Sequence, residues 1–221
     1  NWYLLGVKND FKKKKDFFTF ELFGYKLILY YFGENNFKVF SNVCLHRGSI
    51  IKKDIYGNGS LVCPYHYWSY SQDGCVNGVP NKKEIFTPNF DKLNLKLEEW
   101  NIDFCGNLIF VSHSSNKKSL SKYLGSKYND LYNCSALLGT KVKKCSWIWN
   151  LNWKLAVENS IDEYHAIYAH LSTFKRTLKL KPEYSYSDNV YSMSMPLNDV
   201  TNKGFAKYKK YLDKYLKNKY T

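Results

Sequence analysis

The feature that most restricts what this chain can fold into is a pair of short segments that each offer one cysteine and one histidine. Cys44-x-His46 is followed, after sixteen residues, by Cys63-x2-His66. Thiolate sulfur and imidazole nitrogen are the protein ligands that soft and borderline metal ions prefer. Each short spacing places its two side chains on one tight loop. The sequence therefore predicts a metal centre at which two loops meet.

The mixed pairing within each segment indicates the kind of centre. A Rieske-type [2Fe–2S] cluster binds one iron through two cysteines and the other through two histidines, and one cysteine and one histidine per loop supply that set. The alternative is a structural zinc site of Cys2His2 type. Zinc fingers, however, pair cysteine with cysteine and histidine with histidine within each short spacing. We therefore predict a [2Fe–2S] cluster bound by Cys44, His46, Cys63 and His66.

The first half of the chain is predicted to be an all-β domain that covers residues 1–112. Short runs of β-forming residues alternate there with turns rich in glycine and proline. Gly33 to Asn36 is expected to be the turn of a hairpin. The strongest strand predictions are Lys26–Phe32, Phe37–Ser41, Ser60–Cys63, Tyr67–Ser71 and Leu108–Val111.

A second domain is predicted over residues 113–221. Residues 113–130 are polar and predict a linker, after which the apolar residues recur with the period of a helix. Residues 205–216 predict a second amphipathic helix with a basic outer face. The apolar face of the first helix is predicted to consist of Trp153, Val157, Ile161, Tyr164 and Tyr168.

Composition excludes several classes of protein. The net charge is +14, but of the 33 basic residues only Arg47 and Arg176 are arginine, the residue that nucleic-acid surfaces favour, so we expect no nucleic-acid partner. No apolar run approaches the roughly 18 residues of a membrane span. The cysteines outside the ligand pattern are expected to be buried free thiols, which predicts a reducing, cytoplasmic compartment; they are Cys75, Cys105, Cys134 and Cys145.

A second group of chemically active residues lies on the predicted helix that ends at His170. On a straight helix Glu158, Asp162 and His165 fall within about 60° of each other. Carboxylates and an imidazole beside an apolar face are costly unless they are paired or bound to metal. His170 lies about 140° away from His165, so both can bind one ion only if the helix ends or bulges between them.

Both motifs resemble one known family. Cys44-x-His46-Arg47-Gly48 and Cys63-x2-His66-x-Trp68 resemble the Rieske domain of aromatic-ring-hydroxylating and related Rieske oxygenases. The string from Asn159 to His170 is similar to the mononuclear-iron motif of their α-subunits. Neither ligand loop has the additional cysteine of respiratory Rieske proteins. One departure is Tyr67, where oxygenases usually have glycine.

The resemblance implies an α+β fold, in which the all-β Rieske [2Fe–2S] domain is followed by part of a helix-grip-like catalytic domain. It implies that His165 and His170 bind a mononuclear Fe(II). Asp162 resembles the family's bridging carboxylate, which would connect His165 to the cluster ligand His66 of the partner subunit. Asn159 would lie close to the iron without being a firm ligand.

The activity implied by the resemblance is that of the terminal oxygenase component of a Rieske non-heme iron oxygenase. Electrons would come from a reductase or ferredoxin, and O2 would be used to hydroxylate or demethylate an organic substrate, in a homotrimer. A Rieske-type electron carrier without oxygenase activity is the alternative. The family's third iron ligand is a carboxylate far beyond the second histidine, and none of Asp188, Asp199 and Asp213 lies in such a context. We therefore expect a chain that is truncated at its C-terminus.

Overall fold

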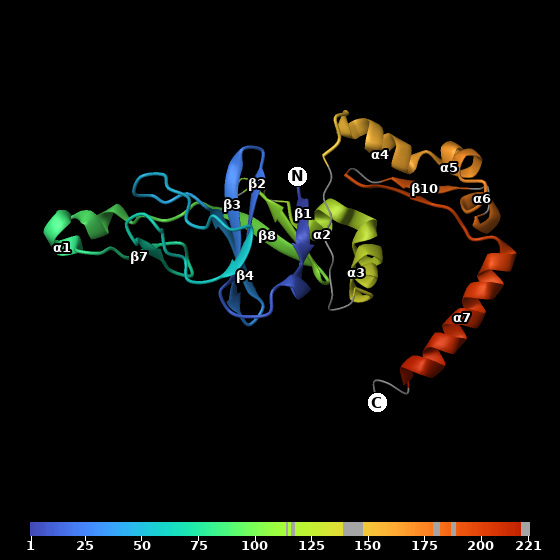
Figure 1. The fold of residues 1–221 in the computed structure, drawn as a ribbon, viewed down its shortest axis with the longest axis horizontal. Coiled ribbons are helices and arrows are strands. Elements are labelled where there is room, and N and C mark those ends of the chain that lie inside the picture. The colour runs from blue at the N-terminus through green and yellow to red at the C-terminus, as the bar shows by residue number, and fades with distance from the viewer. Residues whose placement is uncertain (114, 116–117, 139–147, 179–181, 187–188, 218–221) are drawn as a thin grey trace. The chain divides into compact units, whose positions relative to one another are not determined.

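The computed structural model describes residues 1–113, 115, 118–138, 148–178, 182–186 and 189–217, of which Ile167 and residues 211–217 are described by their backbone alone. Two compact units are present, Asn1–Lys143 and Lys144–Thr221. Both can be followed along the chain in Figure 1. Each unit is described below by itself.

A seven-stranded antiparallel sheet forms the body of the first unit, in the order β1-β9-β8-β4-β3-β2-β5. The predicted strands in β3, β4 and β9 are confirmed. A short 3-10 turn (Lys8–Asp10) follows the first strand. The strands are β1 (Tyr3–Val7), β2 (Asp16–Leu22), β3 (Tyr25–Gly33), β4 (Asn36–Ser41), β5 (Tyr56–Asn58), β8 (Glu99–Cys105) and β9 (Leu108–Ser112).

The position of strand β3 in the sheet explains why its sequence contains a continuous apolar run. Successive side chains of a strand point to opposite faces, and here both faces are covered. Leu27 and Leu29 belong to one buried core, whereas Ile28 and Tyr30 belong to the other. The second of these cores also contains Cys44 and Cys63, so the predicted metal centre rests directly on the sheet.

The predicted turn between β3 and β4 is confirmed. Glu34 and Asn35 both have positive φ, 53° and 58°, and Gly33 pairs with Asn36 across the turn. Two central residues with positive φ are the mark of a type I′ turn, whose twist matches that of the flanking strands.

The predicted ligands lie in a lobe that carries little regular structure. It contains the two-stranded sheet of β6 (Ser69–Tyr70) and β7 (Val76–Gly78), helix α1 (Lys82–Ile85) and a 3-10 turn (Phe90–Leu93). The strand predicted over Ser60–Cys63 is wrong, since only an isolated bridge between Val62 and Ser69 forms there. The strand predicted over Tyr67–Ser71 shortens to β6. The physical reason is that the backbone between these two segments forms the second ligand loop. It must turn sharply there to present the side chains of the loop.

The linker predicted for residues 113–130 is wrong over its second half. Helices α2 (Leu120–Leu124) and α3 (Tyr128–Ala136) form there, joined by a 3-10 turn (Gly125–Lys127). The backbone N–H of Leu120 donates to the Asp103 carboxylate at 3.2 Å, and the Tyr128 hydroxyl donates to the Phe104 carbonyl at 3.1 Å. Because Leu120 and Leu124 are buried, this polar segment is part of the first unit.

The second unit contains helices and a β-hairpin. Strand β10 (Glu183–Tyr186) pairs with β11 (Tyr191–Ser194), and the helix predicted over residues 205–216 is confirmed as part of α7 (Asp199–Lys217). The other helices are α4 (Trp153–Ile161), α5 (Glu163–Ala169) and α6 (Phe174–Thr177). The predicted apolar face is divided between α4 and α5, and its side chains are exposed, from Ile161 at 38% to Tyr164 at 70%.

Three of the four additional cysteines fall within the described residues, and all three are free thiols: Cys105 is buried, Cys75 half-buried and Cys134 exposed. Burial was therefore predicted correctly for Cys105 and wrongly for Cys134. Cys145 lies outside the described residues. In the part of the chain that the structure describes, no helix is long and apolar enough to cross a membrane.

Candidate functional site

The two predicted ligand loops have the same backbone hydrogen bonds. In the first, the N–H of Gly48 donates to the carbonyl of Cys44 at 2.9 Å; in the second, the N–H of Tyr67 donates to the carbonyl of Cys63 at 3.0 Å. Gly48 and Tyr67 thus hold equivalent positions, and both have left-handed backbones, with φ of 69° and 59°. A residue with a Cβ atom pays about 1–2 kcal/mol for that conformation. The tyrosine therefore keeps the loop geometry at a cost in strain.

The four predicted cluster ligands converge. The rings of His46 and His66 lie 4.6 Å apart between centroids at an interplanar angle of 72°. Cys44 and Cys63 are buried, and their side chains lie within hydrogen-bond distance of each other. The fold thus brings the two histidines together and the two cysteines together, while the assignment of all four residues as ligands stays a prediction.

One observation at this site fits a bound metal. The buried Nδ1 atom of His46 has no hydrogen-bond partner, although buried polar atoms are nearly always paired. Within the described residues no three His, Cys, Asp or Glu side chains are placed to bind one ion. A cluster that takes only two protein ligands per iron does not need three. The donor set and the unpaired nitrogen therefore fit a [2Fe–2S] cluster.

Hydroxyl groups contact both cysteine sulfurs, each from a residue near the other cysteine. The Tyr70 hydroxyl donates to Cys44 Sγ at 3.1 Å and accepts the N–H of Leu45 at 3.1 Å. Burial, followed by the contact with Cys44, raises the pKa of Tyr70 well above its ordinary value, so this hydroxyl keeps its proton. On the other side Ser49 hydrogen-bonds the Cys63 side chain. No role was predicted from the sequence for Tyr70 or Ser49, so both hydroxyl contacts were missed.

The two thiols differ in acidity. Burial raises the pKa of Cys44. Burial acts in the same direction on Cys63, but the N–H groups of Tyr65 and His66 and the Ser49 hydroxyl hold the pKa of Cys63 below its ordinary value. Burial, followed by the charges of His66 and Arg47, lowers the pKa of His46. A neutral imidazole and a thiolate are the forms that bind metal, and the pKa shifts of His46 and Cys63 favour these forms, whereas that of Cys44 does not.

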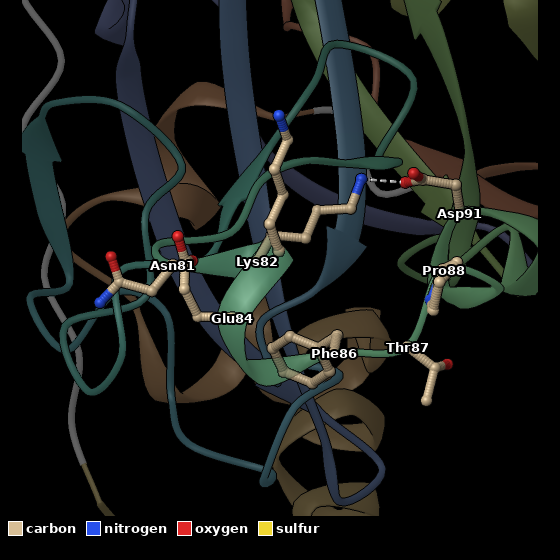
Figure 2. Close-up of a pocket in the computed structure, with 8 residues that line it drawn as sticks. Asn81, Lys82, Glu84, Phe86, Thr87, Pro88 and Asp91 are labelled. Carbon is tan, nitrogen blue, oxygen red and sulfur yellow. Dashed lines mark hydrogen bonds and ion pairs between the residues drawn. The ribbon is translucent and has the colours of Figure 1, made fainter.

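Two hollows lie in this part of the first unit, and one of them is lined by residues of the ligand loops. One of about 500 Å³ is lined by both histidines together with aromatic and apolar neighbours, among them Tyr65, Tyr67 and Trp68. The other, of about 650 Å³, is lined by residues 81–84, 86–88 and 91. Figure 2 shows the second hollow, with Phe86 beside it and an ion pair between Lys82 and Asp91. Phe86 borders both hollows.

The second predicted site lies in the other unit, where the helix breaks at Asp162. Asp162 has an extended backbone, ends α4 and begins α5. Its carboxylate accepts the backbone N–H groups of Tyr164 and His165 at 2.9 and 3.3 Å, which is the usual work of a helix N-cap. The single straight helix assumed from the sequence is therefore wrong, because the aspartate side chain competes for these N–H groups.

The break changes how the predicted iron ligands meet. Helix α5 ends at Ala169, and the rings of His165 and His170 lie 5.4 Å apart. The condition set from the sequence, that the helix end before His170, is met. His165 Nδ1 lies 3.0 Å from the Asp162 carbonyl and 3.8 Å from its carboxylate. The Asp162 carboxylate thus caps the helix and makes no direct hydrogen bond to the ring.

The remaining predicted residues are Asn159 and the three candidate carboxylates, of which Asp199 is exposed at the start of α7. Asn159 is exposed on α4, and no contact of its side chain joins it to either histidine in the described part of the chain. Among the candidate carboxylates, Asp188 and the side chain of Asp213 lie outside the described residues. The third iron ligand is therefore not identified.

Comparison with known proteins gives a consistent answer. The sequence profile of the Rieske [2Fe–2S] domain matches residues 1–91. The chain is 32% identical over 179 residues to the α-subunit of benzene 1,2-dioxygenase from Pseudomonas putida, an alignment that covers 78% of this chain and 40% of that protein. It is 26% identical over 184 residues to the oxygenase subunit of glycine betaine monooxygenase from Pseudomonas aeruginosa, over 80% and 41%.

The solved structures agree in fold. Naphthalene 1,2-dioxygenase from Rhodococcus sp. superposes with a TM-score of 0.71 at 25% identity, over 86% of this chain and 46% of that one. A quaternary ammonium Rieske monooxygenase gives a TM-score of 0.74 at 20% identity, over 89% and 56%. The chain spans about 40% of the length of the curated relatives it matches. The chain therefore begins with a Rieske [2Fe–2S] domain, and over 179 residues it is homologous to the α-subunits of Rieske oxygenases.

Proposed function

We propose that this chain belongs to the terminal oxygenase component of a Rieske non-heme iron oxygenase. The observation that carries the proposal is the presence, in one chain and in the family's order, of two convergent ligand sets. In the first unit His46, whose Nδ1 is unpaired, lies beside His66, and the thiols of Cys44 and Cys63 are buried. In the second, the rings of His165 and His170 lie 5.4 Å apart where α5 ends.

Each residue has a proposed task. Cys44 and Cys63 would bind one iron of the cluster, and His46 and His66 the other. His165 and His170 would bind a mononuclear Fe(II), together with a carboxylate that is not identified. When bound, the cluster supplies single electrons and the mononuclear iron supplies open positions for O2 and substrate.

The protein's own side chains prepare these sites. The Tyr70 and Ser49 hydroxyls stabilise the charge on the two sulfurs. The Asp162 cap fixes the first turn of α5 and thereby orients His165, and we propose that its carboxylate also connects this histidine to His66 of the partner subunit. Asn159 is proposed to lie near the iron. We further propose that the electron-storing part is residues 1–112 and that residues 113–221 belong to the catalytic domain, although α2 and α3 pack in the first unit.

The length of the alignments to known oxygenases favours an oxygenase over an electron carrier. A carrier needs little more than the first 112 residues, whereas the alignments to oxygenase subunits run over 179 and 184 residues. The proposed partners are O2, an organic substrate and a reductase or ferredoxin, in a cytoplasmic homotrimer. Nucleic acid and membrane are not among the proposed partners.

Iron content and O2 consumption test the proposal. Iron and acid-labile sulfide would be measured in the anaerobically reconstituted chain, in His46→Ala and in His165→Ala. We expect His46→Ala to lose the sulfide and most of the iron, and His165→Ala to lose only the iron that exceeds the sulfide. Iron equal to sulfide in the unaltered chain would contradict a second iron site.

The substrate test uses the chemistry named in the relatives. The chemically reduced chain, loaded with iron, would be exposed to O2 with benzene or with glycine betaine. We expect O2 consumption and an oxygenated product with one of the two classes, and neither with His165→Ala. Equal O2 consumption in the unaltered chain and in His165→Ala would contradict an oxygenase.

A further inference from the structure

The two histidines at the cluster site have opposite surroundings. His66 is exposed, and besides His46 its ring lies close to the ring of Tyr65, at 3.9 Å between centroids. His46 is half-buried and stacks on Trp68 at 4.8 Å, with only 9° between the ring planes. Trp68 itself is buried. One side of the site is therefore open and the other is closed by an aromatic ring.

Trp68 is held in place by two phenylalanines from a segment that follows the ligand loops. Phe86 meets its ring edge-on at 5.7 Å and Phe90 at 5.5 Å, and the two phenylalanines lie 4.6 Å apart. Phe86 also approaches the His46 ring at 6.4 Å. We call Trp68, Phe86 and Phe90 the aromatic cap. Edge-to-face contacts at such distances contribute about 0.5–1.5 kcal/mol each beyond the area they bury.

The segment that carries the two phenylalanines is stabilised by contacts between its own residues. Lys82 at the start of α1 forms an ion pair with Asp91, shown by the dashed line in Figure 2, and its ammonium lies 5.7 Å from the centre of the Phe90 ring. Phe86 points toward the ligand loops from the end of α1, and both phenylalanines pack against the core that contains Cys44 and Cys63. None of these segment residues belongs to the predicted ligand set.

We propose that Phe86 and Phe90 are positioning residues that press Trp68 onto His46 and keep water from that side of the cluster. This inference rests on the proposed cluster and adds a role for a segment outside its ligand loops. Its consequences are a lower midpoint potential and a slower loss of the cluster than an uncovered His46 would give.

The sign of the effect on the potential follows from charge. With two thiolates and two neutral imidazoles, the charges of two ferric ions, two sulfides and two thiolates cancel. Reduction adds one electron from the external reductant and no proton, which leaves a single negative charge. Because removal of water penalises the charged form, the aromatic cap opposes reduction, and solvent exposure is one of the factors that set such potentials.

Replacement of Phe86 tests the proposal in the full chain with its cluster. Phe86→Ala opens the aromatic cap, whereas Phe86→Leu keeps most of the apolar volume. Leu93→Ala is a control in the same segment, since Leu93 is exposed, and Phe20→Ala is a control of similar size in the other core. The readouts are the midpoint potential, by optical titration with dithionite, and the rate at which a chelator bleaches the visible absorbance.

We expect Phe86→Ala to raise the equilibrium constant for one-electron reduction at least threefold, about 28 mV, since tenfold corresponds to 59 mV. Bleaching should accelerate, Phe86→Leu should recover most of both values, and the two controls should leave the potential unchanged. An unchanged or lower potential in Phe86→Ala, or an equal rise in Leu93→Ala, overturns the proposal. If Phe86→Ala loses its cluster on purification, Phe90→Ala, which opens the same aromatic cap, decides by the same criteria. An unaltered chain without visible absorbance would instead refute the proposed function.

Discussion

Replacing Tyr70 with phenylalanine removes a single oxygen atom from the buried side of the cluster site. That oxygen donates a hydrogen bond to Cys44 Sγ at 3.1 Å and accepts the N–H of Leu45 at 3.1 Å. The ring itself is buried and packs in the core below the cluster, so the phenylalanine fits the same space. The substitution thus separates the hydroxyl from the ring that carries it.

The magnitude follows from the charge that the hydroxyl faces. A hydrogen bond to a charged group is worth about 1.5–3 kcal/mol. The sulfur is negative in both oxidation states, and reduction adds further charge to it. If about one third of the bond energy distinguishes the two states, the difference is ~0.5–1 kcal/mol. For one electron this is about 20–40 mV, and since the bond favours the more negative state, Tyr70→Phe should lower the potential.

Tyr30→Phe is the matched control for this substitution. Tyr30 is also buried in the same core, but its hydroxyl donates to the Gly59 carbonyl at 3.0 Å instead of a predicted ligand. Spectroelectrochemical titration of both variants should show a lower potential for Tyr70→Phe alone, while both lose some stability. A potential that is unchanged or raised in Tyr70→Phe, or lowered equally in Tyr30→Phe, would refute the reasoning.

Three further results are expected. Tyr67→Gly should raise the free energy of unfolding by about 1 kcal/mol in denaturant titrations, because glycine adopts the left-handed backbone without strain; a decrease would show that the tyrosine ring contributes more than the strain costs. Burial acts to raise the pKa of Asp16, but hydrogen bonds from Lys13, Asn58 and Lys12 hold it below its ordinary value. This carboxylate therefore adds stability above the unfolded pKa of about 4 and loses it as pH falls through the folded pKa, so Asp16→Asn should flatten the acid side of the stability profile, and an unchanged profile would count against the assignment. Asp162→Asn should retain the cap of α5, since asparagine caps as well as aspartate, and should keep the iron while losing most turnover in the complete enzyme; turnover at the native rate would make the carboxylate a cap and nothing more.

The sequence was sufficient to predict the parts of the fold that are locally strong. Strands β3 and β9 contain continuous apolar runs, β4 buries Phe37, Val39 and Phe40, and the turn between β3 and β4 contains Glu34 and Asn35 at its left-handed positions. Strands β2 and β8 were not identified, because they alternate between apolar and polar residues and bury few side chains: Phe17 in the first, Trp100 and Cys105 in the second.

Helices α2 and α3 were missed for a different reason. Their sequence is polar, and they are fixed by a few distant contacts, such as those that Asp103 and Phe104 make with Leu120 and Tyr128. The spacing of apolar residues in the sequence does not predict such contacts. A local signal did exist, since Ser119 caps α2 by accepting the N–H of Lys122 at 3.4 Å.

The residues of the candidate site likewise fall into those that could be predicted from the sequence and those that could not. The ligand residues could be predicted because two chemically unusual spacings occur close together in the chain. Phe86 and Phe90 could not, because their part in the site depends on how a segment about twenty residues beyond His66 folds back on Trp68. The break at Asp162 could have been anticipated from its preference for the N-cap position, had the apolar period not suggested one continuous helix.

The most direct test of the central claim is the nitrogen coupling in the pulsed electron paramagnetic resonance spectrum of the reduced chain. If His46 and His66 bind one iron, two imidazole nitrogens couple to the unpaired electron. We expect both couplings in the unaltered chain, in Tyr70→Phe and in Phe86→Leu, and no such signal in Cys63→Ala, which loses a sulfur ligand. A colourless chain that binds zinc, or a reduced cluster without histidine nitrogen coupling, would contradict the claim that this protein holds a Rieske cluster between these two loops.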